Sequence, residues 1–182
     1  SKPIATAQTV TATEETAKEI TLAGTDADGE TLTYSIVDSP SNGTVTLNGN
    51  TATYTSTSDT ATSDSFTFKV NDGTVDSDAA TVTINITAVN DKPVATAQTV
   101  TATEETAKTI TLAGTDADGD TLSYIVASLP SNGTLTDNGT VITSDDLPKT
   151  TTGTDVVYTA TSESATSDSF TFKVNDGTVD SD

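Results

Sequence analysis

The chain has 182 residues and a formal net charge of −20, with 27 acidic residues against seven lysines and no arginine or histidine. This charge argues against nucleic acid, whose phosphates need cationic partners, and against an anionic membrane surface, whereas it suits multivalent metal cations. Cysteine is also absent, so no disulfide can stabilise a domain. With no histidine, cysteine or arginine, an enzyme is not expected.

An internal repeat dominates the sequence. Residues 4–30 and 94–120 differ at only three positions, and Ala61–Asp78 is identical to Ala165–Asp182. A repeat this close predicts a string of like modules, and a spacing of 90 residues suits a common domain size. Extended surface proteins use such copies because copy number sets their reach. We therefore expect two tandem domains, residues 1–90 and 91–182.

Apolar residues alternate with threonine along the first repeat, a period of two that favours strands. Seven strands are expected, at residues 5–13, 18–23, 31–37, 43–47, 51–56, 65–70 and 79–87. Asp-Gly and Asn-Gly turns separate them, so the fold class is all-β, with two antiparallel immunoglobulin-type sandwiches end to end. The expected inward-facing residues are Ile20, Leu22, Leu32, Tyr34, Ile36, Val45, Tyr54, Phe66, Phe68, Val70, Val82, Ile84 and Ile86.

The second repeat departs from the first in two places. Extra residues near 136–155 lengthen the connection after its fourth strand, and we expect them to form an added hairpin. This hairpin is either a binding loop or a tolerated surface insertion, and the second interpretation is preferred. The sequence also stops at Asp182, where the first repeat continues with AATVTINITAVND. The second domain is therefore expected to lack its final strand, which either the same protein or a neighbouring chain would supply by strand addition.

The acidic residues gather in loops at the two ends of each predicted sandwich. Alternating strand directions place Glu14 and Asp64 at one end of the first domain, next to the link that contains Asn90 and Asp91. Many oxygen ligands at one place are what Ca²⁺ requires, whereas Mg²⁺ prefers to keep its waters. We therefore expect Ca²⁺ at the junction, with the facing loops of the second domain contributing Asp116, Asp118 and Asp176.

Four motifs in this order resemble those of cadherin repeats. Ala-Gly-Thr-Asp-Ala-Asp-Gly resembles their Asp-x-Asp region, Val-Asn-Asp-Gly a later motif, Val-Asn-Asp-Lys-Pro the interdomain linker, and Thr-Glu-Glu-Thr the site of the linker-facing glutamate. The chain resembles in particular the bacterial cadherin-like or Ig-like repeats of large secreted adhesins. This resemblance implies extracellular arrays stiffened by Ca²⁺, with the ligands Glu14, Asp64, Asn90, Asp91, Asp116, Asp118 and Asp176, and an N-terminal half-site of Asp26, Asp28 and Asp72.

The linker departs from the cadherin pattern at Ala88 and Lys92, so fewer ions per junction are expected. The predicted function is a calcium-stiffened structural spacer of a bacterial extracellular or cell-surface adhesin. The alternatives are a subunit of an extracellular filament or surface layer joined by strand addition, and a carbohydrate-binding module. Partners are the neighbouring repeats of the same chain and like subunits, with no nucleic acid and no membrane insertion. Any export signal would lie outside this sequence.

Overall fold

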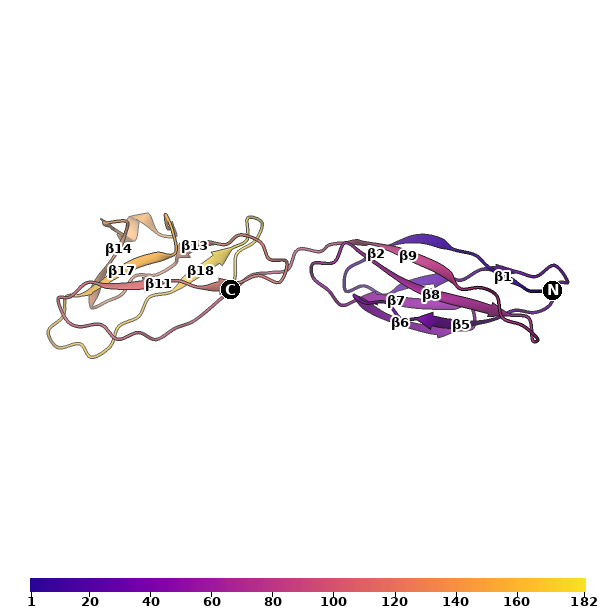
Figure 1. Ribbon diagram of the computed structural model, residues 1–182. Helices are drawn as coiled ribbons and strands as arrows, with labels where there is room; N and C mark the ends of the chain where they lie inside the picture. The colour runs from indigo at the N-terminus through magenta and orange to yellow at the C-terminus, as the bar shows by residue number, and fades with distance from the viewer. The chain divides into compact units, whose positions relative to one another are not determined.

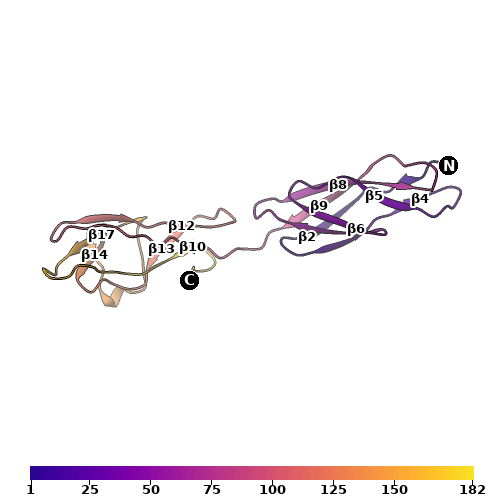
Figure 2. The same ribbon diagram turned by 90° about the horizontal axis from the view of Figure 1, so that it is seen from below.

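In the computed structural model, which describes residues 1–182, both repeats are built almost entirely from short β-strands (Figures 1 and 2). The fold divides into two units, Ser1–Asn90 and Asp91–Asp182, and each has its own hydrophobic core. The one helix is a 3-10 turn, Ser144–Asp146 (η1). No helix of the structure has the length and the hydrophobicity that a membrane span needs.

Unit 1 is a sandwich of two main sheets. Its strands are β1 (Ile4–Ala5), β2 (Gln8–Thr13), β3 (Lys18–Thr21), β4 (Gly24–Thr25), β5 (Thr33–Asp38), β6 (Gly43–Asn48), β7 (Thr51–Ser56), β8 (Ser63–Asn71) and β9 (Ala80–Thr87). One sheet has the order β2-β9-β8-β5 and the other β3-β7-β6, while β1 and β4 form a separate pair. The predicted all-β sandwich is confirmed.

The first predicted strand is divided between two partners. β1 pairs antiparallel with β4, and β2 runs parallel to β9, from Gln8 opposite Val82 to Thr13 opposite Thr87. The sandwich is antiparallel except for this pair. The division needs a close approach at Gly24, where a Cβ atom would lie 3.0 Å from the carbonyl oxygen of Ile4.

The core of unit 1 lies between the two main sheets. Phe66, Phe68 and Val70 on β8 and Val82 and Ile84 on β9 are at most 1% exposed, because alternate residues of a strand face the same side. Every residue of the predicted inward-facing set belongs to this core or packs against it. Three alanines that the prediction omitted are also buried in it, Ala12, Ala52 and Ala80.

A buried carboxylate ties the loop before β6 to the start of β8. Asp64 accepts hydrogen bonds from the backbone N–H groups of Ser41, Asn42 and Ser65 and from the Tyr54 hydroxyl, at 2.8 to 3.0 Å. Burial raises the pKa of Tyr54 to about 12, and the hydrogen bond to Asp64 adds to the rise. Its phenol is therefore neutral and remains a donor throughout the physiological pH range.

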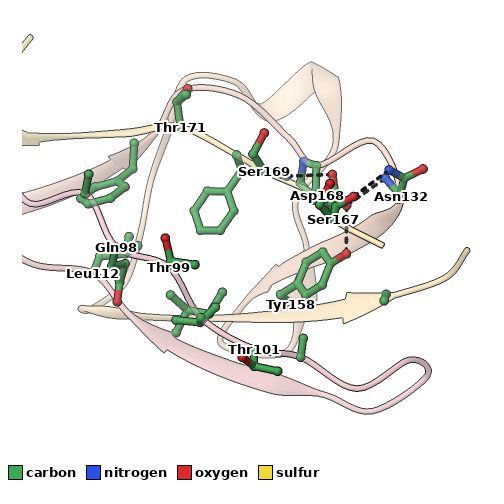
Figure 3. Close-up of a pocket in the computed structure, with 18 of the residues that line it drawn as sticks. Gln98, Thr99, Thr101, Leu112, Asn132, Tyr158, Ser167, Asp168, Ser169 and Thr171 are labelled. Carbon is green, nitrogen blue, oxygen red and sulfur yellow. Dashed lines mark hydrogen bonds between the residues drawn. The ribbon is translucent and has the colours of Figure 1, made fainter. Parts of the chain in front are cut away.

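Unit 2 repeats the same connection at Asp168 (Figure 3). This carboxylate accepts from the backbone of Ser131, Asn132 and Ser169 and from the hydroxyl of Tyr158, at 2.9 Å each. Burial opposes ionisation of Asp168, but these donors outweigh it and lower its pKa. The pKa of Tyr158 is raised, first by burial and then by Asp168. Each unit thus holds its sandwich together by the same four-donor arrangement.

Unit 2 has as many strands as unit 1, but they cover fewer residues. It comprises β10 (Val94–Ala95), β11 (Lys108–Thr111), β12 (Gly114–Thr115), β13 (Ser123–Val126), β14 (Gly133–Asp137), β15 (Thr140–Val141), β16 (Lys149–Thr150), β17 (Asp155–Ala160) and β18 (Phe172–Asn175). The sheets have the orders β11-β17-β14-β15 and β16-β13-β18, beside the pair β10-β12. No strand within residues 91–182 takes the position that β9 has in unit 1.

The predicted insertion forms a hairpin and covers a sheet edge. β14 and β15 turn at Asn138 and Gly139, both at positive φ, which is typical of a tight hairpin. After η1, β16 pairs with β13, so the insertion protects the outer edge of that strand. Asp137 is buried and accepts from the backbone N–H and the hydroxyl of Thr152, which joins the two ends of the insertion.

We expect Asp64→Asn to lower the free energy of unfolding of unit 1 by about 2–4 kcal/mol. Hydrogen bonds to a charged group contribute about 1.5–3 kcal/mol each, and the asparagine would place an NH₂ group among four donors. Hydrogen exchange of peptides from residues 1–90 measures the loss. Glu19→Gln, at an exposed position of β3, is the control and should change stability by less than about 0.5 kcal/mol. Equal protection in both variants would contradict the role of Asp64.

Candidate metal centre

Two acidic turns have the same geometry, one in each unit. The turn between β4 and β5 brings carboxylate oxygens of Asp26, Asp28 and Glu30 within 4.8 Å of one another. The turn between β12 and β13 does the same with the corresponding residues, Asp116, Asp118 and Asp120. Each turn contains a glycine at positive φ, Gly29 or Gly119, a conformation that most side chains avoid. We call these groups the first and the second acidic cluster.

Each cluster contains a buried carboxylate oxygen without a hydrogen-bond partner. In the first, Asp26 Oδ1 accepts from the N–H of Asp28 at 2.7 Å, while Oδ2 is buried and unpaired. In the second, Asp116 Oδ1 accepts from the N–H of Asp120 at 3.0 Å, and again Oδ2 is buried and unpaired. Burying an unpaired charged oxygen is costly, and a bound cation would remove that cost.

The carboxylates within the first cluster shift one another's pKa values. The pKa of Glu30 is raised, first because its protonated form can share a hydrogen bond with Asp26. The same interaction lowers the pKa of Asp26. The terminal ammonium group of Ser1 contacts Asp28, which raises the pKa of that ammonium.

Asp91 takes the place of Ser1 in the second unit, as the repeat spacing requires. Its backbone N–H donates to Asp118 Oδ2 at 2.7 Å, so the start of unit 2 is tied to the second acidic cluster. The amino group of Ser1 has the equivalent contact with Asp28 in unit 1. At position 91 the backbone nitrogen belongs to a peptide bond and carries no charge.

Glu14 is the most deeply buried carboxylate among the predicted ligands. It is 2% exposed, its Oε2 accepts from the N–H of Val89 at 3.0 Å, and its Oε1 is buried without a partner. Its backbone N–H donates to the carbonyl of Thr87, the last residue of β9. Glu104 has the same sequence neighbours, but it is exposed. Glu14 is therefore held in place by the segment that follows β9.

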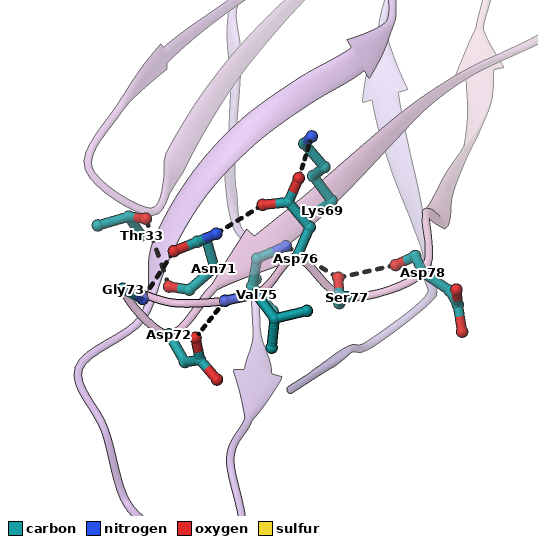
Figure 4. A network of polar contacts seen from close by, with 10 residues as sticks. Thr33, Lys69, Asn71, Asp72, Gly73, Val75, Asp76, Ser77 and Asp78 are labelled. Carbon is teal, nitrogen blue, oxygen red and sulfur yellow. Dashed lines mark hydrogen bonds and ion pairs between the residues drawn. The ribbon is translucent and has the colours of Figure 1, made fainter. Parts of the chain in front are cut away.

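Two further predicted ligands, Asp72 and Asp176, shape the turns in which they lie, and Figure 4 shows the turn of Asp72. Asp72 Oδ1 accepts from the N–H groups of Thr74 and Val75 at 2.7 and 2.8 Å. The equivalent oxygen of Asp176 accepts from Thr178 and Val179 at 2.6 and 2.7 Å. In the same turn of unit 1, Asp76 contacts Lys69 and Asn71, and the Lys69 contact is the main reason its pKa is lowered.

The structure separates seven of the predicted ligands into three groups, while the other three are Glu14, which accepts from Val89, and Asn90 and Asp91 of the link itself. Asp26 with Asp28, and Asp116 with Asp118, converge in the acidic clusters, where they are joined by Glu30 and Asp120, which the predicted ligand set omitted. Asp72 and Asp176 hold turns. Asp64 has both carboxylate oxygens occupied by protein donors. The signal for Glu30 and Asp120 was present in the sequence, because each follows the turn glycine directly.

Comparisons with known proteins identify the fold and the family. The curated integrin beta-like protein A of Dictyostelium discoideum is 30% identical over 188 residues, covering 88% of this chain but only 10% of the relative, so this chain spans about a tenth of that protein. A protocadherin gammaB7 EC3-6 cis-dimer structure superposes with a TM-score of 0.54 at 15% identity, over 97% of this chain and 49% of that one.

The protocadherin GammaB4 extracellular domain has a TM-score of 0.50 at 16% identity, over 99% of this chain and 34% of that one. At these identities the two structures show the tandem cadherin-like fold. The family model described as bacterial Ig domain matches residues 1–85 and again residues 90–182. With both repeats matched nearly throughout, the chain belongs to the bacterial Ig domain family.

Proposed function

We propose that this chain is a pair of calcium-binding structural spacer repeats of a bacterial extracellular adhesin or surface protein, without enzymatic activity. The observation that carries the proposal is the set of buried carboxylate oxygens without hydrogen-bond partners, at Glu14, Asp26 and Asp116. Two of the three belong to turns in which further carboxylates converge. Such an arrangement repels itself when it is empty and is stabilised when a cation enters.

The chemistry of the ligands favours Ca²⁺. The chain contains no cysteine or histidine, so the softer ligands typical of zinc, copper or iron sites are absent. Carboxylate and backbone oxygens in large number suit Ca²⁺, which takes six to eight ligands in flexible geometry. Mg²⁺ demands a tighter octahedron and keeps several waters. Extracellular calcium would supply the ion, in line with the resemblance to cadherin repeats.

The proposed spacer role rests on hydrogen bonds that join two of the proposed ligands to the link between the repeats. Glu14 is tied to Val89 within unit 1, and Asp118 is tied to Asp91 within unit 2. The two link residues, Val89 and Asp91, are two positions apart in sequence. We propose that Glu14 in unit 1 and Asp116 with Asp118 in unit 2 bind Ca²⁺, and that Asn90 and Asp91 of the link add ligands, which would restrict the link. Asp64 is left out of this ligand set, because its oxygens are already occupied.

Asp116→Asn should have opposite effects with and without calcium. In EDTA the amide can donate to a neighbouring carboxylate of the second acidic cluster, which relieves repulsion, so the melting temperature should rise. In Ca²⁺ the variant should lose most of the gain that the native chain shows, about 2.7 kcal/mol at a concentration 100-fold above Kd. Calorimetry in both buffers measures this. Asp145→Asn, in η1, is the control. A fall of equal size in both buffers would contradict a metal site.

Glu14→Gln and Glu104→Gln form a matched pair in identical sequence surroundings. The buried Glu14 should be needed for calcium binding, and we expect its replacement to weaken binding at least tenfold, about 1.4 kcal/mol. The glutamine can still accept from Val89, so the metal-free fold should be retained. The exposed Glu104 should be replaceable without effect. Titration calorimetry compares the two, and indistinguishable isotherms would show that Glu14 is not a ligand.

Calcium should also restrict the motion of one repeat against the other. Residues 88–93 link the units, and the proposed ligands Asn90 and Asp91 belong to that segment. We expect small-angle scattering to show a narrower distribution of radii of gyration in Ca²⁺ than in EDTA, with no such change for Glu14→Gln. Superimposable native profiles in the two buffers would reject the stiffening role while leaving calcium binding itself intact.

A further inference from the structure

Four segments of the chain have the pattern Asn-x-Thr, in which x is not proline. This pattern is the acceptor signal for N-linked oligosaccharides in exported proteins, where the modified asparagine lies at the surface. The four asparagines are Asn42, Asn85, Asn132 and Asn138. They differ in how the fold holds them, and the difference separates one of the four from the rest.

Three of these asparagines are held by the sandwiches. The side-chain amide of Asn42 donates to the carbonyl of Ser63 at 3.2 Å, and that of Asn132 donates to Ser167 at 3.3 Å. Both asparagines are only partly exposed. Asn85 lies within β9, whose backbone pairs with β2 on one side and β8 on the other. A transferase has to grip the acceptor segment, and gripping these three would break a side-chain hydrogen bond or a sheet.

Asn138 is presented differently, at the tip of the β14–β15 hairpin. Asn138 and Thr140, the first and third residues of the signal, are both exposed. The side-chain amide of Asn138 makes no hydrogen bond within the chain. Gly139 between them is so open that a Cβ atom built there would meet no other atom within 4 Å. The turn therefore has room for a bulky group on Asn138.

The corresponding turn of unit 1 has an exposed asparagine without the signal. β6 ends at Asn48, which is also followed by a glycine, but the third residue there is Asn50. The signal requires a hydroxyl side chain at that position. The insertion of unit 2 thus contains the one tight turn of the chain in which a free asparagine and a complete signal coincide.

We propose that Asn138 is the acceptor of an N-linked oligosaccharide. Its amide nitrogen forms a bond to C1 of the first sugar of a lipid-linked oligosaccharide, while the bond from C1 to the lipid diphosphate breaks. The lipid diphosphate leaves, one amide proton passes to a base, and nothing is oxidised or reduced. The inference rests on the proposed extracellular placement, because the transferases concerned act on exported chains. The glycan adds a hydrated group close in sequence to Val141, an apolar side chain that is 51% exposed.

Mass spectrometry of intact glycopeptides tests the proposal on the full chain as its own cells export it. Trypsin releases residues 109–149, which contain both Asn132 and Asn138, and fragmentation assigns the sugar to one of them. We expect an oligosaccharide on Asn138 and none on Asn132. Because the sugar itself is weighed, spontaneous deamidation of an Asn-Gly pair is not mistaken for its removal. An exported chain without sugar on Asn138 would overturn the proposal.

Reciprocal substitutions in the two matched turns separate the signal from the turn. The folded chain, incubated with a lipid-linked oligosaccharide and an oligosaccharyltransferase, should gain one glycan. Thr140→Asn should gain none, and Asn50→Thr should gain a second glycan, on Asn48. Equal modification of the native chain and Thr140→Asn would contradict the assignment. Calcium titration of Thr140→Asn should match that of the native chain, since residue 140 lies outside both acidic clusters, so failure of this inference leaves the calcium proposal standing.

Discussion

β9 pairs with a strand on each side, and both the hydrophobic core of unit 1 and the position of Glu14 depend on this pairing. β9 joins β2 to β8 and places three aliphatic side chains in the core of unit 1. Burying each is worth about 1.5–3 kcal/mol, a large share of the 5–15 kcal/mol that stabilises a typical domain. The segment after β9 also holds Glu14 in its buried position. The sandwich core and the proposed ligand at its end therefore depend on one strand.

The two repeats show how far sequence alone can specify structure. Alternation of apolar residues with threonine predicted every strand of unit 1 except the two-residue β4, because burial of one strand face is a local pattern. It could not reveal that residues 98–103 remain outside any strand, since Gln8–Thr13 has the same sequence and is one. The difference is tertiary: a strand needs a partner for its backbone. The parallel pairing of β2 with β9 was missed for the same reason.

The candidate site was predictable where its geometry is local. Asp26 and Asp28, like Asp116 and Asp118, converge because a glycine at positive φ turns the chain between closely spaced acids. Asp64 depended on distant partners, since two of the N–H groups that it accepts from belong to Ser41 and Asn42, more than 20 positions earlier in the sequence. Its acidity was visible, but its role as a tether was not. Nearness to other acids in sequence therefore predicts which carboxylates lie close together better than assignment to one end of the sandwich does.

The central claim is that calcium enters discrete sites instead of screening a general negative charge. A calcium titration followed residue by residue with ¹H–¹⁵N NMR tests this most directly. The account predicts early, saturating shifts at the amides of Asp28, Asp91 and Asp120, each of which donates to a cluster carboxylate or lies next to one. Small, non-saturating shifts spread over the amides near all 27 acidic residues would contradict it.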